Sequence, residues 1–156
     1  MTKILALIFS ILLIFFPDSA FVLANYQDWS FPGTAEIQDS IVEAINNDDA
    51  DAIEAMLSQY KIENGENLNQ KIKNLIAAVD GEIIEYRDNG SGGDGDYVNA
   101  GVYIKDICWD VDVKTDNDEE YLLCISWIKV NTVNPQKVGM SSLRLCDTDF
   151  NRIATV

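Results

Sequence analysis

The chain has 156 residues, with 11 Lys and Arg against 26 Asp and Glu and a formal net charge of −15. This excess of negative charge repels phosphate backbones and anionic lipids, so the sequence predicts no nucleic-acid binding. Histidine is absent, which excludes Ser-His-Asp and Cys-His catalysis and His-ligated zinc. The acidity fits solubility outside the cell, and the alternative is attraction to a basic partner or to cations.

Residues 1–24 have the organisation of a secretory signal peptide. A short basic start precedes an apolar run over residues 4–16, and a bilayer-spanning helix needs about 20 such residues. Small residues then predict cleavage between Ala24 and Asn25, with an uncleaved N-terminal anchor as the alternative. Cleavage would yield an exported or secreted protein without a stable membrane anchor.

After an extended arm at residues 25–33, apolar side chains at helical spacing predict three helices. The first begins at Thr34 as N-cap, and polar residues 46–49 separate it from the second. Residues 64–65 end the second helix and residues 80–81 end the third. The three apolar stripes are Ile37, Ile41 and Ile45; Ile53, Met56, Leu57 and Tyr60; and Leu68, Ile72, Leu75, Ile76 and Val79.

Beyond residue 81 the apolar period changes to two, which predicts strands. The strand segments are residues 82–87, 97–115, 121–130 and 141–146. The Gly- and Asp-rich residues 88–96 predict a flexible loop. Within residues 97–115 the apolar side chains move from even to odd positions, which in a pleated strand requires an inserted residue. We therefore expect a bulge or sharp bend near Lys105 and Asp106.

Folding each hairpin about its loop predicts one apolar face of the sheet. The predicted neighbours are Trp109 opposite Ile125, Ile107 opposite Trp127, and Leu143 and Leu145 alongside them. The helices precede the sheet and must pack on this face. The expected fold is a single α+β domain over residues 34–156, with a strongly bent antiparallel sheet around its N-terminal helices.

The same counting places Cys108, Cys124 and Cys146 on the opposite face, with Cys124 directly across from Cys146. In an oxidising compartment these two could form a disulfide, and the alternative is three free thiols. No C-x-x-C spacing is present, so we do not expect a thiolate metal site.

Two acidic loops resemble calcium-binding segments only in part. Residues 92–96 match one calcium-binding nonapeptide turn, but Tyr97 occupies the required aspartate position and no repeat follows. Residues 147–151 begin like an EF-hand loop but lack its central glycine. Surface loops are the better interpretation, and the sequence predicts no metal and no cofactor.

Several segments in order resemble family 5104 of the bacterial domains of unknown function, over about residues 34–147. They are IVEAINNDDADAIEAML at 41–57, LIAAVDGEII at 75–84, the Gly-rich loop, and PQKVGM at 135–140. The resemblance implies a small exported protein and an NTF2-like (cystatin-like) fold, in which helices precede a conical sheet. Many family members carry a lipobox cysteine, which this chain lacks. The family implies no activity and no catalytic residues.

Such a cone often holds a ligand pocket, which Tyr86, Trp109 and Trp127 could line; the alternative is that they fill the core. We expect a non-catalytic binding or interaction module for an unknown small molecule or protein. A second hypothesis is an immunity or inhibitor-type protein that binds a basic partner. A third is an enzyme that uses carboxylate and tyrosine on a small apolar substrate, although Asp106, Asp110 and Asp112 fall opposite the apolar face.

Overall fold

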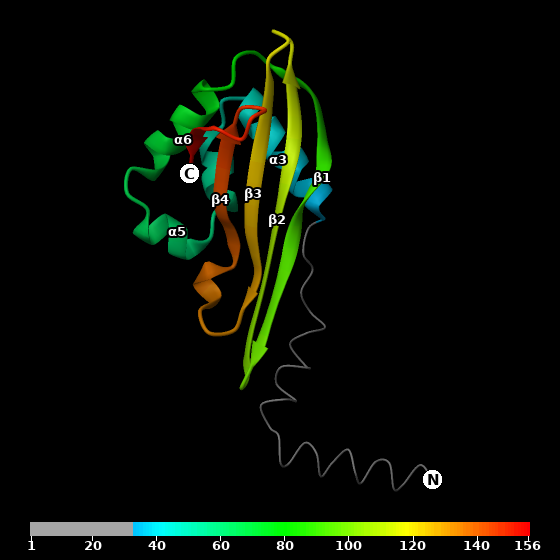
Figure 1. Ribbon diagram of the computed structural model, residues 1–156. Helices are drawn as coiled ribbons and strands as arrows, with labels where there is room; N and C mark the ends of the chain where they lie inside the picture. Colours follow the sequence, from blue (N-terminus) through cyan, green and yellow to red (C-terminus); the bar gives the residue numbers. More distant parts are fainter. Residues whose placement is uncertain (1–32) are drawn as a thin grey trace, which may run out of the picture.

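The computed structural model describes residues 33–156, and the predicted signal peptide and its cleavage site between Ala24 and Asn25 lie outside the described residues. Labels follow Figure 1, in which helices come first and strands follow. The elements are α3 (Thr34–Asn46), α4 (Ala50–Met56), α5 (Gln59–Asn64), α6 (Leu68–Ala77), β1 (Ile83–Asn99), β2 (Val102–Thr115), β3 (Glu120–Asn131), the 3-10 turn η1 (Pro135–Lys137), β4 (Gly139–Cys146) and β5 (Arg152–Thr155).

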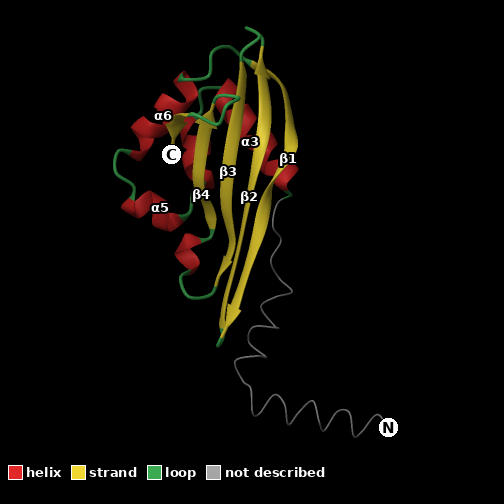
Figure 2. Cartoon of the chain, viewed as in Figure 1, coloured by secondary structure: helices red, strands yellow, loops and turns green. Residues whose placement is uncertain are grey.

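The five strands form one antiparallel sheet in the order β1-β2-β3-β4-β5, so every strand pairs with its neighbour in the chain. The helices gather on one face of this sheet and leave the other face open (Figure 2). This arrangement confirms the predicted α+β class, with helices preceding an antiparallel sheet. The short strand β5 has no counterpart in the sequence prediction.

The core lies between the helices and the apolar face of the sheet. Trp109 pairs with Ile125 and Ile107 with Trp127, so the predicted register of β2 against β3 is confirmed. Both layers contribute fully buried side chains, namely Ile41, Ile53, Ile72 and Leu75 from the helices and Val111, Leu123, Ile125, Leu143 and Leu145 from the sheet. Each of these large side chains stabilises the fold by about 1.5–3 kcal/mol through burial.

The second predicted helix is in fact two helices, because the chain becomes extended at Leu57 and Ser58. Leu57 forms a parallel bridge with Met140, and the Ser58 N–H donates to the Met140 carbonyl at 3.0 Å. The Ser58 hydroxyl then caps α5 by accepting from the Lys61 N–H at 3.2 Å. Contact with β4 therefore overrides the helical period, and Tyr60 turns outward with 42% of its surface exposed.

The prediction of a flexible loop at residues 88–96 is wrong, because these residues belong to β1, which pairs with β2. Asp88 pairs with Val111 and Gly92 with Trp109, so residues 89–91 form a bulge. Inside it the Gly90 N–H donates to the Asp88 carboxylate at 2.8 Å. Glycine and aspartate have poor strand propensity, but pairing with the apolar strand β2 decides the outcome here.

The irregularity predicted near Lys105 and Asp106 is present, but its extra residue belongs to the neighbouring strand. The register of β2 against β3 shifts between these two residues, with Lys129 of β3 inserted. Against β1, the same part of β2 pairs without interruption. The segment at 97–115 is also not one strand, because Ala100 and Gly101 turn the chain with φ values of 46° and 83°.

Candidate functional site

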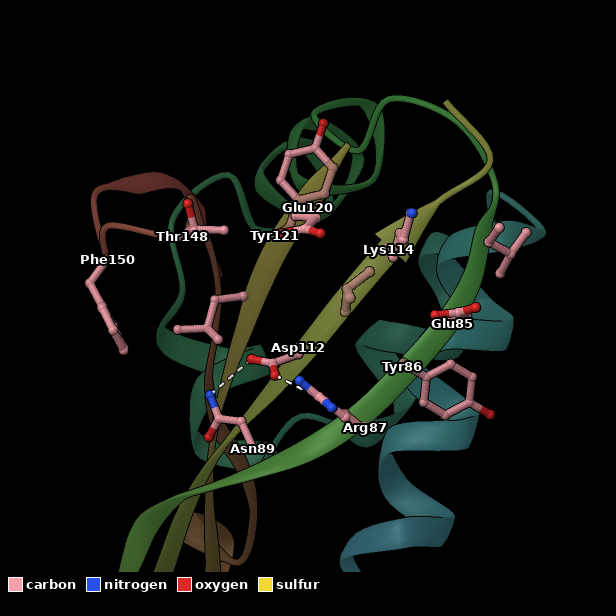
Figure 3. A pocket seen from close by; sticks show the side chains of 13 residues that line it. Glu85, Tyr86, Arg87, Asn89, Asp112, Lys114, Glu120, Tyr121, Thr148 and Phe150 are labelled. Atoms are coloured by element: carbon pink, nitrogen blue, oxygen red, sulfur yellow. Dashed lines mark hydrogen bonds and ion pairs between the residues drawn. The ribbon is translucent and has the colours of Figure 1, made fainter. Parts of the chain in front are cut away.

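A groove of about 710 Å³ lies mainly on the face of the sheet that the helices leave open. We call it the open-face groove. Because side chains alternate along a strand, Asp112 and Lys114 of β2 point to this face while Val111 and Val113 point to the core. The groove spans β1, β2 and β3 and reaches the loop between β4 and β5 (Figure 3). Its lining residues are Ile84, Glu85, Tyr86, Arg87, Asn89, Asp112, Val113, Lys114, Glu120, Tyr121, Leu122, Thr148 and Phe150.

One polar network in the groove centres on Asp112. Its carboxylate accepts from Arg87 Nε at 3.2 Å and from Asn89 Nδ2 at 3.1 Å (Figure 3). The Asn89 side-chain oxygen accepts from the Ser91 N–H at 2.8 Å, which ties this network to the β1 bulge. Within residues 33–156, the terminal amino groups of Arg87 have no hydrogen-bond acceptor, and 81% of its side chain is exposed. One nitrogen of the guanidinium therefore contacts Asp112 while its other donors remain available.

A second polar row crosses the same strands, with Glu85 paired to Lys114 and Lys114 to Glu120. The Lys114 ammonium binds the Asp118 carboxylate at 2.9 Å. This contact raises the pKa of Lys114, as do the nearby charges of Glu85 and Glu120, and it lowers the pKa of Asp118. In the described part of the chain neither Glu85 nor Glu120 forms an ion pair.

The apolar rim of the groove consists of Ile84 and Phe150, which are 56% and 60% exposed. Phe150 has a φ of 64°, an uncommon conformation for a bulky residue. Its loop is held by the Asp147 carboxylate, which accepts from the Asp149 N–H and from the backbone and side chain of Asn151 at 2.8–3.0 Å. These hydrogen bonds lower the pKa of Asp147. The segment that resembles an EF-hand thus uses its first carboxylate to fix a turn.

Of the three aromatic residues proposed as pocket lining, Trp109 and Trp127 are diagonal neighbours on the core face of the sheet, and Tyr86 stands apart from them. Tyr86 reaches the groove edge, where its hydroxyl donates to Asp39 at 3.0 Å, the main cause of its raised pKa. Trp109 is 3% exposed and packs in the core, and Trp127 lies partly buried against that core. The cavity lies on the other side of the sheet from the predicted position.

Sequence reasoning missed Arg87, Asn89, Asp112 and Phe150 as groove residues. Alternation in β2 placed Asp112 on the open face correctly. The register of β1 was hidden because residues 88–96 were assigned to a loop. Recognising Ala100 and Gly101 as the hairpin turn would have placed Asn89 opposite Asp112. The bulge at residues 89–91, which shifts the register by two residues, is also needed to pair Arg87 with Asp112.

The cysteines lie on the open face, but Cys124 is not directly opposite Cys146. Cys124 pairs with Arg144 and Cys146 with Leu122, so the two cysteines are diagonal neighbours. Both thiols are free and buried in a small cluster with Leu122. Burial, with hydrogen bonding to Asp110 and Cys146, raises the pKa of Cys124 to about 12.

Alkylation is expected to distinguish the exposed thiol from the two buried ones. Cys108 is exposed, so iodoacetamide at pH 8 should label it first. A pKa of about 12 for Cys124 implies a thiolate fraction roughly a thousandfold below that of an ordinary thiol. Peptide mass spectrometry checks the order, with Cys124 and Cys146 labelled only after unfolding. If these two resist labelling in the unfolded, unreduced chain, they form the disulfide that the sequence suggested.

Two classes of feature are absent from the described residues. No group of three or more Cys, Asp or Glu in residues 33–156 has the arrangement to hold a metal ion. No helix within that range is long and apolar enough to cross a membrane.

Fold and groove define a small α+β protein with a helix layer on one sheet face and a groove on the other. The chain belongs to the family described as a domain of unknown function (DUF5104), which matches residues 40–148. This match confirms the family inferred from the sequence. Comparison with curated proteins gives no match.

Proposed function

We propose that this protein is a non-catalytic binding module that holds a ligand in the open-face groove. One observation carries the proposal: a groove with an exposed apolar rim contains a guanidinium that contacts Asp112 through Nε and whose terminal donors have no acceptor in the described chain. Ligand sites commonly combine apolar walls with a few oriented polar groups. The carboxylate of Asp112 is engaged by Arg87 and Asn89, which suits it to orienting a guanidinium rather than to moving protons.

The setting of this module follows from the sequence and the family. We propose an exported bacterial protein whose leader is removed after Ala24. We also propose an NTF2-like fold, supported by helices that precede an antiparallel sheet and cover one of its faces. The inserted residues Lys129 in β3 and Ser141 in β4 support curvature of that sheet, because an inserted residue bends a strand.

A second candidate function is recognition of a basic protein partner. Residues 34–60, which form α3, α4 and the start of α5, carry seven carboxylates and no Lys or Arg. The carboxylates are Glu36, Asp39, Glu43, Asp48, Asp49, Asp51 and Glu54. Such a surface attracts cationic partners and raises their association rate at low salt.

Native mass spectrometry of the protein recovered from its exporting host tests the binding proposal. The expected result is a mass excess over the sequence that disappears on denaturation. Phe150→Ala should reduce the retained fraction because it removes one apolar wall of the groove. Tyr97→Ala provides the matched control, since Tyr97 is an exposed aromatic residue on the β1–β2 hairpin, outside the groove.

Three outcomes separate the candidate functions. A mass excess that remains in the Tyr97→Ala variant and is lost in the Phe150→Ala variant supports ligand binding in the groove. A retained mass insensitive to Phe150→Ala overturns the groove as the site. The second candidate is favoured if the protein shows no mass excess but binds a basic protein in a pull-down, and if this association weakens as the salt concentration rises.

A further inference from the structure

We infer that the open-face groove binds a zwitterionic dipeptide that carries an apolar side chain. This inference rests on the proposed function and specifies its ligand. Three features of the groove carry it: a free guanidinium end, two carboxylates without ion-pair partners, and an exposed apolar rim. Each feature matches one part of a dipeptide with free termini.

Arg87 provides the position for the carboxylate end. Its Nε is engaged by Asp112 at 3.2 Å, so the guanidinium is oriented across the groove floor toward β2 (Figure 3). The two terminal amino groups have no acceptor within the described chain and are open to solvent. Paired guanidinium N–H groups match the two oxygens of a carboxylate in a planar, bidentate contact.

Glu85 provides the position for the ammonium end, and Glu120, two strands away, adds a second negative charge. They lie on either side of Lys114, whose own ammonium is directed to Asp118 at 2.9 Å. Glu85 stands two residues from Arg87 on β1, a separation of about 7 Å along a strand. Two residues of extended chain also span about 7 Å. The two charged ends of a dipeptide therefore fit the distance between these side chains.

Ile84 and Phe150 form the apolar part of the site. They stand on opposite sides of the groove, one on β1 and one on the β4–β5 loop. The Asp147 hydrogen bonds hold the Phe150 loop in place before any ligand arrives. A ligand side chain that packs against either rim would bury apolar surface there, which favours dipeptides with an apolar or aromatic residue.

The balance of charge in the groove favours a zwitterion over a simple anion or cation. Its lining contains two cations, Arg87 and Lys114, and three carboxylates, Glu85, Asp112 and Glu120. The whole chain carries −15, so its long-range field repels a free anion. A molecule with one charge of each sign meets no such repulsion and can still satisfy both ends of the groove.

Isothermal titration calorimetry with the dipeptide Ala-Phe and with its N-acetylated, C-amidated form tests the inference. The free dipeptide should bind about tenfold more tightly than the capped form, because capping removes charge-assisted hydrogen bonds. Arg87→Gln should weaken the free dipeptide about tenfold and leave the capped form nearly unaffected. Lys73→Gln removes the same charge from the exposed face of α6 and should change neither affinity.

The outcomes distinguish the ligand class from the proposed function. Equal binding of the free and capped forms, both weakened by Phe150→Ala, overturns the zwitterion and leaves groove binding intact. The dipeptide inference is also overturned if Ala-Phe does not bind at millimolar concentration while the protein from its host carries a mass excess that Phe150→Ala reduces. Absence of both dipeptide binding and retained mass removes the inference and the proposed function together.

Discussion

Leu75→Ala is expected to lower the free energy of unfolding by about 2–5 kcal/mol. The Leu75 side chain is fully buried on α6, where the helix packs against α4 and β5. Truncation removes the transfer free energy of its methyl groups and leaves a cavity that the neighbouring elements can only partly fill. Urea unfolding checks the result, with the midpoint lowered and the slope unchanged, since the surface exposed on unfolding stays nearly the same.

Lys73→Ala is the matched control on the same helix. Lys73 lies two residues earlier, is exposed, and has no hydrogen bond or ion pair in the described chain. Its replacement should change the free energy of unfolding by no more than about 0.5 kcal/mol. If both variants unfold at the same urea concentration, the face of α6 that includes Leu75 does not contribute to the core.

The core was predictable because its residues follow one period over long segments. Leu75 lies on the helical stripe that the sequence shows, and Trp109 and Ile125 meet in the predicted register. Alternation then fixes the opposite face as well, which is why Asp112 was correctly placed away from the core. The α+β class follows from these two periods and from their order in the chain.

The groove was not predictable from the same signals, because it depends on one pairing that local composition disguises. Residues 88–96 have the composition of a loop, yet all of them except the bulge at residues 89–91 pair with β2. Only this pairing places Arg87 and Asn89 at Asp112. Phe150 presents a similar difficulty, since a polar turn centred on Asp147 determines where its ring points.

The break between α4 and α5 shows the same competition between local and long-range preference. Leu57 continues an apolar stripe at helical spacing, but the chain there is extended and bridges to Met140. Gly139 allows this approach, because it adopts a φ of 123° directly beside Ser58. The link between the helix layer and β4 thus depends on a residue without a side chain.

Gly139→Ala is therefore expected to lower the free energy of unfolding by about 1–3 kcal/mol, the usual range for such backbone strain. A Cβ at this position would lie 3.0 Å from both the Cα and the N of Ser58, which are backbone atoms. The hydrogen bond from Ser58 N–H to the Met140 carbonyl should weaken as the chains separate. Amide hydrogen exchange at Ser58, measured beside urea unfolding, reports that local opening.

Gly93→Ala is the control for this substitution. An added Cβ on Gly93 meets no atom within 4 Å, and its φ lies outside the left-handed region. The change in unfolding free energy should stay within about 0.5 kcal/mol. Equal destabilisation by the two substitutions would mean that loss of glycine as such, rather than contact between β4 and the α4–α5 link, determines the effect. Faster exchange at Ser58 in Gly139→Ala alone would show that this contact helps to hold the α4–α5 link against β4.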